Sequence, residues 1–140
     1  MAHTFPSDAW VKAFRQEINQ SDAYRNSAAT WDAGDLCLVI TANPALGLKE
    51  DYYIWLDLDH GVCKKAKHVS SAEGEAAKFT IRADYDRWKQ IFNRELHPIM
   101  AMVQGKLKVK GHLFIILKYK QAAQDLVECA SNVVTKFIDE

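Results

Sequence analysis

The sequence lacks the long apolar run that a membrane-spanning helix requires. No apolar stretch in the 140 residues approaches the ~18 residues of a bilayer span, and the N-terminal residues lack the pattern of a secretory signal. Glycine and proline are also scarce, at 6 and 3 residues, which excludes collagen-like and low-complexity chains. We therefore expect a folded globular protein that is neither exported nor embedded in a membrane.

Net charge and a paired cysteine pattern are missing as well. Eighteen basic and eighteen acidic side chains cancel, so no global field attracts a polyanion, and nucleic acid is not an expected partner. Cys37, Cys63 and Cys129 are an odd number at long spacings, which fits neither a disulfide framework nor a zinc site. We expect no metal and no cofactor, and we assign the chain to a reducing, cytoplasmic compartment.

The hydrophobic patterning is that of one mixed domain. Ser7 and Ser21 can each cap a helix, and after a turn the run Leu36 to Ala42 is typical of a strand that is covered on both faces. We expect a single domain over residues 1–140. Within it, 1–31 form an N-terminal helical extension and 32–140 form the core, while His3 lies in a mobile tail.

Alternating residues predict the rest of the sheet. Period-two patterns favour strands at residues 52–59, 79–83 and 106–110, and the Lys-rich segment 62–69 is typical of an edge strand whose charges discourage pairing with another chain. Helices are expected after Asp84 and Pro98, and a long C-terminal helix from Leu113 to about Phe137, bent near Tyr119. This order predicts an α+β fold with one five-stranded, mostly antiparallel sheet that helices cover on one face.

A family resemblance is carried by residues 100–111, which read Met-Ala-Met-Val-Gln-Gly-Lys-Leu-Lys-Val-Lys-Gly. This segment resembles the Gln-Gly-Lys-Leu-Lys-x-x-Gly signature of the type-2 sterol carrier proteins. The strand Phe79-Thr80-Ile81 and the acidic, Trp-containing helix at 84–93 are also similar to that family, as is the long helix after the fifth strand. The likeness covers most of the chain from Trp31 onward.

The resemblance implies a tunnel between the sheet and the helices that accepts sterols, acyl chains or similar amphiphiles. It implies no catalytic residue. An apolar space of this kind needs apolar and adaptable side chains. We expect its wall to contain Ile91, Phe92, Ile99, Met100, Met102, Val103, Phe114, Leu117 and Val134, although ordinary core packing would explain each of these residues taken alone.

The resulting hypothesis is a non-enzymatic intracellular lipid carrier. Lys106, Lys108 and Lys110 could make transient contact with a membrane surface, or could simply form a solvated strand face. Two alternatives remain open. A small hydrolase or isomerase could use the same pocket, with Asp57, Asp59 and His60 as groups that could bind a metal or move protons. Alternatively, the chain could be a regulatory or dimerisation module whose apolar wall contacts another protein.

Overall fold

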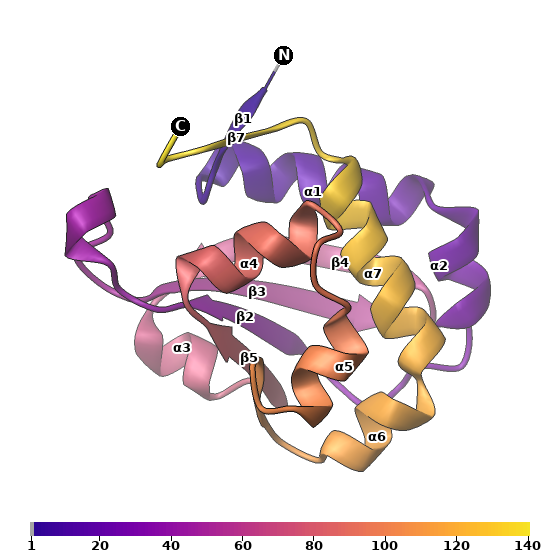
Figure 1. The fold of residues 1–140 in the computed structure, drawn as a ribbon. Helices are drawn as coiled ribbons and strands as arrows, with labels where there is room; N and C mark the ends of the chain where they lie inside the picture. Colours follow the sequence, from indigo (N-terminus) through magenta and orange to yellow (C-terminus); the bar gives the residue numbers. More distant parts are fainter. Residues whose placement is uncertain (1) are drawn as a thin grey trace.

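A computed structural model describes residues 2–140 and shows a twisted sheet flanked by helices (Figure 1). In chain order the elements are β1 (His3–Phe5), α1 (Asp8–Gln20), α2 (Asp22–Ser27), β2 (Leu36–Ile40), a 3₁₀ turn (Pro44–Leu46), β3 (Tyr52–Asp59), β4 (Val62–Val69), α3 (Ser71–Glu75), β5 (Phe79–Ala83), α4 (Tyr85–Phe92), α5 (Pro98–Val103), β6 (Lys108–Lys110), α6 (Leu113–Lys118), α7 (Lys120–Asn132) and β7 (Thr135–Phe137). None of the helices within residues 2–140 is long and apolar enough to cross a membrane.

The main sheet has five strands in the order β4-β3-β2-β5-β6. The β2–β5 pair is parallel and the other three pairs are antiparallel, which confirms the predicted fold class. The β3–β4 hairpin turns at His60 and Gly61, whose φ angles are 49° and 83°. A Cβ on Gly61 would lie 2.7 Å from the carbonyl oxygen of Arg25, so this turn admits only glycine at that position.

Helices cover one face of this sheet, with α4, α5 and α7 lying across it (Figure 1). The main core forms here, and its largest fully buried side chains include Trp10, Phe14 and Trp88. On the opposite face, Cys37 and Val39 of β2 belong to a smaller buried cluster near α3. All five residues of β2 are buried, so the expectation that this strand is covered on both faces is confirmed.

Side-chain caps fix the starts of the helices that the sequence predicted. The Ser7 hydroxyl accepts a hydrogen bond from the Trp10 amide at 3.1 Å, and the Ser21 hydroxyl accepts one from the Tyr24 amide at 3.0 Å. These bonds satisfy N–H groups that have no partner within the helix itself. Both N-terminal helices pack into the same hydrophobic core as the helices of residues 32–140.

The C-terminal segment differs from the single helix expected from Leu113 to Phe137. The helix breaks at Tyr119, where a bend was predicted, and α7 ends at Asn132. The last residues instead form β7, which pairs in parallel with β1, because the β-branched run at 133–135 favours extended backbone and Phe137 is buried. Val134 therefore lies outside any helix, and His3 is part of β1 instead of a mobile tail.

The strand expected at 106–110 begins two residues later, at Lys108. The amides of Lys106 and Leu107 both donate to the carbonyl oxygen of Ala101, at 2.8 and 3.1 Å. These two residues therefore belong to the turn that ends α5, although their alternation continues into the strand.

Candidate functional site

An apolar cavity of about 60 Å³ lies between the main sheet and the helices. Its sheet wall consists of Leu36 and Leu38 from β2, Leu58 from β3 and Ile81 from β5. Leu36 and Leu38 are two residues apart, so they point to the same face of the sheet. Leu38 also stands opposite Ile81 in the β2–β5 ladder, which makes this wall continuous across both strands.

Helix α7 supplies the longest helical wall. The lining residues recur at the three- and four-residue spacing that places side chains on one helix face. They are Tyr119 at the N-cap of α7, followed by Ala122, Ala123, Leu126, Val127 and Ala130. Half of them are alanines. Since alanine carries only a methyl group, the cavity lies where this helix face provides little side-chain volume.

The remaining walls come from several elements, and their polar groups are largely satisfied by the protein. The lining includes Phe14, Tyr24, Trp31, Trp88, Phe92, Met102, Leu107 and Ile116. The indole of Trp31 donates to the Gly34 carbonyl at 3.0 Å, and the hydroxyl of Tyr119 contacts Thr30. Among residues 2–140, no charged side chain lines this cavity.

Tyr24 contributes a hydroxyl to the wall, and within residues 2–140 no fully buried side-chain nitrogen or oxygen is left without a hydrogen-bond partner. The Tyr24 side chain lines the cavity and is 2% exposed, and within the described chain its hydroxyl makes no hydrogen bond. Burial raises the pKa of Tyr24 well above its ordinary value, and the neighbouring Cys63 and Cys129 thiols act in the same direction. The group therefore stays protonated and presents a neutral hydroxyl in an otherwise apolar wall.

The wall predicted from the sequence is divided among three environments. Phe92 and Met102 line the cavity. Ile91 and Ile99 are buried in the core without lining it, and Leu117 is half-buried against that core. The other four side chains are exposed, to the extent of 51% for Met100, 60% for Val103, 74% for Phe114 and 64% for Val134.

The sequence predicted that the inward face of the strands lines the site, but it named none of the four residues of the sheet wall, and it did not include Phe14, Tyr24 or Trp31. The alternation within β2 predicts a buried face but not which neighbour covers it. The helical stripe expected after Leu113 did include Ala123, Leu126 and Val127, so a signal for the α7 wall was present in the spacing.

None of Asp57, Asp59 and His60 lines the cavity, although Leu58, between the two aspartates, does. Asp59 contacts His60 beside it and Lys64 at 3.0 Å, in the β3–β4 hairpin. Hydrogen bonds from Lys64 and His60 lower the pKa of the Asp59 carboxyl. Within residues 2–140 there is no group of three side chains suited to hold a metal ion.

The three cysteines are free and buried. Burial raises the pKa of Cys37 and of Cys63 to about 12, and it also raises that of Cys129. The thiols therefore remain protonated near neutral pH, whereas a nucleophilic cysteine requires a lowered pKa.

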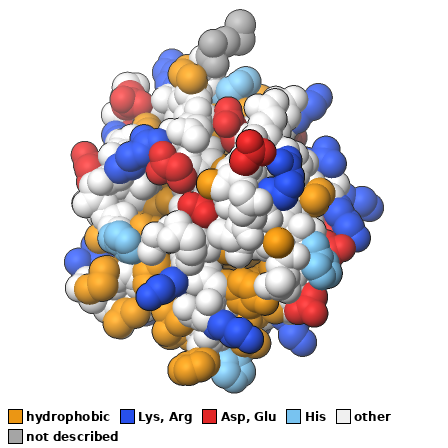
Figure 2. All heavy atoms as spheres, turned by 90° about the vertical axis from the view of Figure 1, so that its right-hand side faces the viewer, with side chains coloured by type: hydrophobic (Ala, Val, Ile, Leu, Met, Phe, Trp, Pro, Cys, Tyr) orange, Lys and Arg blue, Asp and Glu red, His pale blue; other side chains and the backbone are white. Residues whose placement is uncertain are grey.

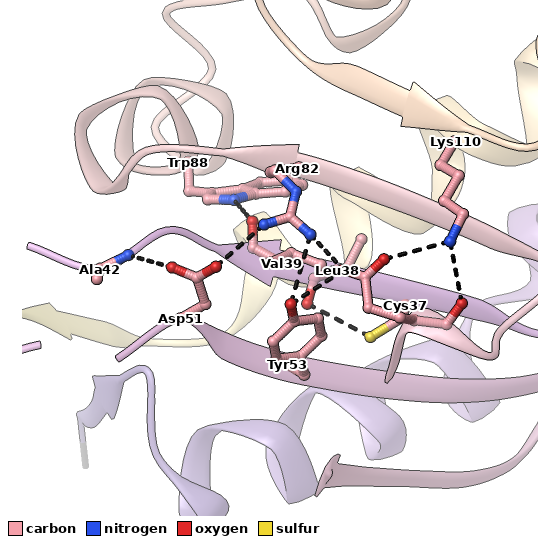
Figure 3. Close-up of polar contacts among 10 residues, drawn as sticks. Cys37, Leu38, Val39, Ala42, Asp51, Tyr53, Arg82, Trp88 and Lys110 are labelled. Carbon is pink, nitrogen blue, oxygen red and sulfur yellow. Dashed lines mark hydrogen bonds and ion pairs between the residues drawn. The ribbon is translucent and has the colours of Figure 1, made fainter. Parts of the chain in front are cut away.

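A polar network occupies the sheet face opposite the cavity (Figure 3). Arg82 forms ion pairs with Asp51, at 3.0 Å, and with Glu75. Lys110 joins the network, with its Nζ 3.3 Å from a carboxylate oxygen of Glu75. Tyr53 donates a hydrogen bond to the same carboxylate at 3.0 Å. These groups satisfy one another and hold α3 against the sheet.

A second hollow, of about 280 Å³, is bordered by Asp35, Trp55, Lys67 and Glu73 among other residues. It is larger than the cavity, but it is open and rimmed by charged side chains, so water can fill it without loss of hydrogen bonds. The cavity with apolar walls is therefore the candidate site.

Comparison with known proteins identifies relatives of this fold. A model of the SCP-2 sterol transfer family matches residues 7–124. The crystal structure of a sterol carrier protein 2 aligns with a TM-score of 0.83 at 40% identity, over 91% of this chain and 97% of that chain. The solution structure of a Thermus thermophilus protein, described as a possible sterol carrier protein, gives 0.84 at 37% identity, over 97% and 94% of the two chains.

More distant structures share the fold alone. The apo form of sterol carrier protein 2 from Yarrowia lipolytica aligns with a TM-score of 0.60 at 19% identity, over 94% of this chain and 97% of that chain. The comparison with curated proteins gave no match.

Fold and cavity together define a class of α+β domains in which helices enclose an apolar space over an open sheet. The chain belongs to the SCP-2 sterol transfer family, because the family model spans most of it and two structures are 40% and 37% identical to it. Membership confirms the resemblance seen in residues 100–111 and supports a role in lipid binding or transfer.

Proposed function

We propose that this chain binds one lipid-like molecule in the cavity between β2 and α7 and carries it inside the cell without altering it chemically. The observation that supports this most strongly is a space between the sheet and the helices whose lining, within residues 2–140, contains no charged side chain. Such a space favours an apolar guest over water. Burying about sixteen methylenes at ~0.8 kcal/mol each gives a gross gain of ~12 kcal/mol, part of which offsets lost motion.

The size of the cavity requires that it widen when a lipid enters. Drug-sized pockets span roughly 300–1,000 Å³, and the cavity holds about 60 Å³. At ~24 cal/mol per Å³, an empty space of about 60 Å³ costs ~1.4 kcal/mol, whereas one of ~300 Å³ would cost ~7 kcal/mol. A nearly closed ligand-free form is therefore the stable one, and the ligand supplies the free energy of opening.

The wall formed by α4 is unsuited to this movement. The Trp88 indole bonds to the backbone of β2 at 3.0 Å, and the Tyr85 hydroxyl donates to the Phe5 carbonyl at 2.6 Å. By contrast, α5 and α6 have six residues each, and α6 has no side-chain cap at its N-terminus. Helices this short depend on packing for their stability, so we assign the opening to α5 and α6.

A titration with a fluorescent acyl-chain probe tests the proposal, with palmitate, a long-chain alcohol and cholesterol as competitors. The informative variant is Ala123→Leu, which fills the cavity from α7, and the matched control is Ala9→Leu on the exposed face of α1. We expect saturation at one probe per chain for the wild type and the control. In Ala123→Leu we expect at least about tenfold weaker binding, equivalent to ~1.4 kcal/mol. Equal binding by all three proteins, or no binding of any of these lipids, would contradict the proposal.

A further inference from the structure

Two short helices expose apolar side chains that the rest of the protein does not cover. Met100 and Val103 on α5 are 51% and 60% exposed, and Phe114 on α6 is 74% exposed. Figure 1 places both helices at the same end of the molecule. We call this region, together with Lys106 and Lys118, the α5–α6 edge. In Figure 2 hydrophobic side chains gather in the lower part of the face, beside basic ones.

The same two helices border the cavity with their other faces. On α5, Met102 lines the cavity and is the residue directly before the exposed Val103. On α6, Ile116 lines the cavity and lies two residues after the exposed Phe114. Each helix is therefore apolar toward the cavity and apolar toward the outside. A helix that is hydrophobic on more than one side needs a cover on each side.

The charges around this edge indicate what covers it. From Leu96 to Gln124 the sequence has no aspartate or glutamate, and its lysines are Lys106, Lys108, Lys110, Lys118 and Lys120. This local excess exists in a chain of zero net charge. Lys110 is paired with Glu75 on the other face of the sheet, but within residues 2–140 neither Lys106 nor Lys118 forms an ion pair. An anionic lipid surface suits this combination, because its headgroups attract the unpaired lysines and its acyl chains take up the protruding apolar side chains.

We propose that the α5–α6 edge docks on an anionic membrane, with Met100, Val103 and Phe114 inserted among the lipids and Lys106 and Lys118 at the headgroups. Docking brings the two helices that we assign to cavity opening against the bilayer, so a lipid can pass between membrane and cavity without crossing water. This inference rests on the proposed function. It also revises the earlier expectation of a membrane contact through Lys106, Lys108 and Lys110, because Lys110 is engaged with Glu75.

Vesicle sedimentation of the full-length protein tests the docking. The probes are vesicles of phosphatidylcholine alone and vesicles of phosphatidylcholine and phosphatidylserine in equal parts. We expect binding to the anionic vesicles only, weakened by added salt. Val103→Glu should weaken it at least about tenfold, since it places a carboxylate at an inserted position, and Lys106→Glu with Lys118→Glu should do the same by reversing the attraction.

Val134→Glu is the matched control, because Val134 is a valine of similar exposure, 64% against 60% for Val103. It directly precedes β7, which Figure 1 shows at the opposite end of the molecule from α5 and α6. It should bind vesicles as the wild type does. Equal vesicle binding by Val103→Glu and Val134→Glu would overturn the proposal, as would equal binding of neutral and anionic vesicles. The proposal would also be overturned if the protein did not bind vesicles but formed a dimer that Val103→Glu dissociates. That result would indicate self-association through this edge.

The acyl-probe titration separates this proposal from the function on which it rests. Val103→Glu should retain binding of the probe from solution, since its side chain points away from the cavity. Normal vesicle docking by a protein that binds no probe would refute the carrier function alone, whereas probe binding without vesicle docking would refute the docking surface alone.

Discussion

The indole N–H of Trp88 donates a 3.0 Å hydrogen bond to the backbone carbonyl of Val39, which joins α4 to the central strand of the sheet. Both residues are buried, so neither group can exchange its partner for bulk water. Trp88 also lines the cavity. The bond therefore holds the α4 wall of the candidate site against the sheet.

Trp88→Phe tests this anchoring. The variant keeps an aromatic ring but removes the donor, which leaves the buried carbonyl of Val39 without this partner. We expect the free energy of unfolding to fall by about 1–3 kcal/mol, from the lost bond and the smaller ring together. Urea denaturation measures the change, and an unchanged midpoint would show that the bond contributes nothing to stability.

Tyr24→Phe and Tyr85→Phe form a matched pair of hydroxyl deletions. The Tyr85 hydroxyl donates to the Phe5 carbonyl and accepts from the Ile138 amide, so its removal should cost about 1–3 kcal/mol. The Tyr24 hydroxyl makes no such bonds within residues 2–140. Its removal should leave stability nearly unchanged, because no hydrogen bond within residues 2–140 is lost and no fully buried side-chain nitrogen or oxygen of these residues is left unpartnered.

Thermal unfolding distinguishes the two variants. A loss of stability in Tyr24→Phe as large as that in Tyr85→Phe would show that the Tyr24 hydroxyl has a partner in solution. A ligand whose polar end is neutral, such as a long-chain alcohol, should bind less tightly to Tyr24→Phe than to the wild type if its hydroxyl meets that of Tyr24.

Alkaline pH should destabilise the protein through its buried thiols. Burial raises the pKa of Cys63 from 9.0 to about 12, so above pH 9 the unfolded chain releases a proton that the folded chain retains. The stabilising contribution is complete below pH 9 and is lost between pH 9 and about 12. The slope is at most ~1.4 kcal/mol per pH unit for this thiol.

Cys63→Ala removes this titration together with the thiol. We expect the free energy of unfolding to decline less steeply with pH in the variant than in the wild type, whatever its stability at neutral pH. Denaturation curves at several alkaline pH values give the two slopes. Identical slopes would mean that Cys63 ionises equally in the folded and unfolded chains.

Much of the fold could be predicted from local sequence patterns. Alternation located β3 and β5, the Lys-rich segment after the His60-Gly61 turn indicated β4, and the hydroxyls of Ser7 and Ser21 marked the starts of α1 and α2. These signals depend on neighbours in the sequence. The pairing of β7 with β1 does not, because it joins the two ends of the chain, and no local pattern in either segment indicates the other.

The cavity was harder to predict, because it is defined by missing volume. Sequence reasoning favoured large apolar residues such as Ile91 and Ile99, which are buried but fill the space around them. The structure places the cavity beside the small side chains of Ala122, Ala123 and Ala130 instead. Periodicity also cannot distinguish an apolar side chain that faces inward from one that faces out on a short helix, as with Phe114.

Mass spectrometry of organic extracts from the purified protein and from folded Ala123→Leu shows whether a lipid occupies the space between β2 and α7. We expect about one lipid molecule per chain in the wild-type extract and a strong reduction in the extract of the variant. Equal amounts of lipid in the two extracts would contradict the proposed site, because a guest unaffected by filling the cavity must be bound somewhere else.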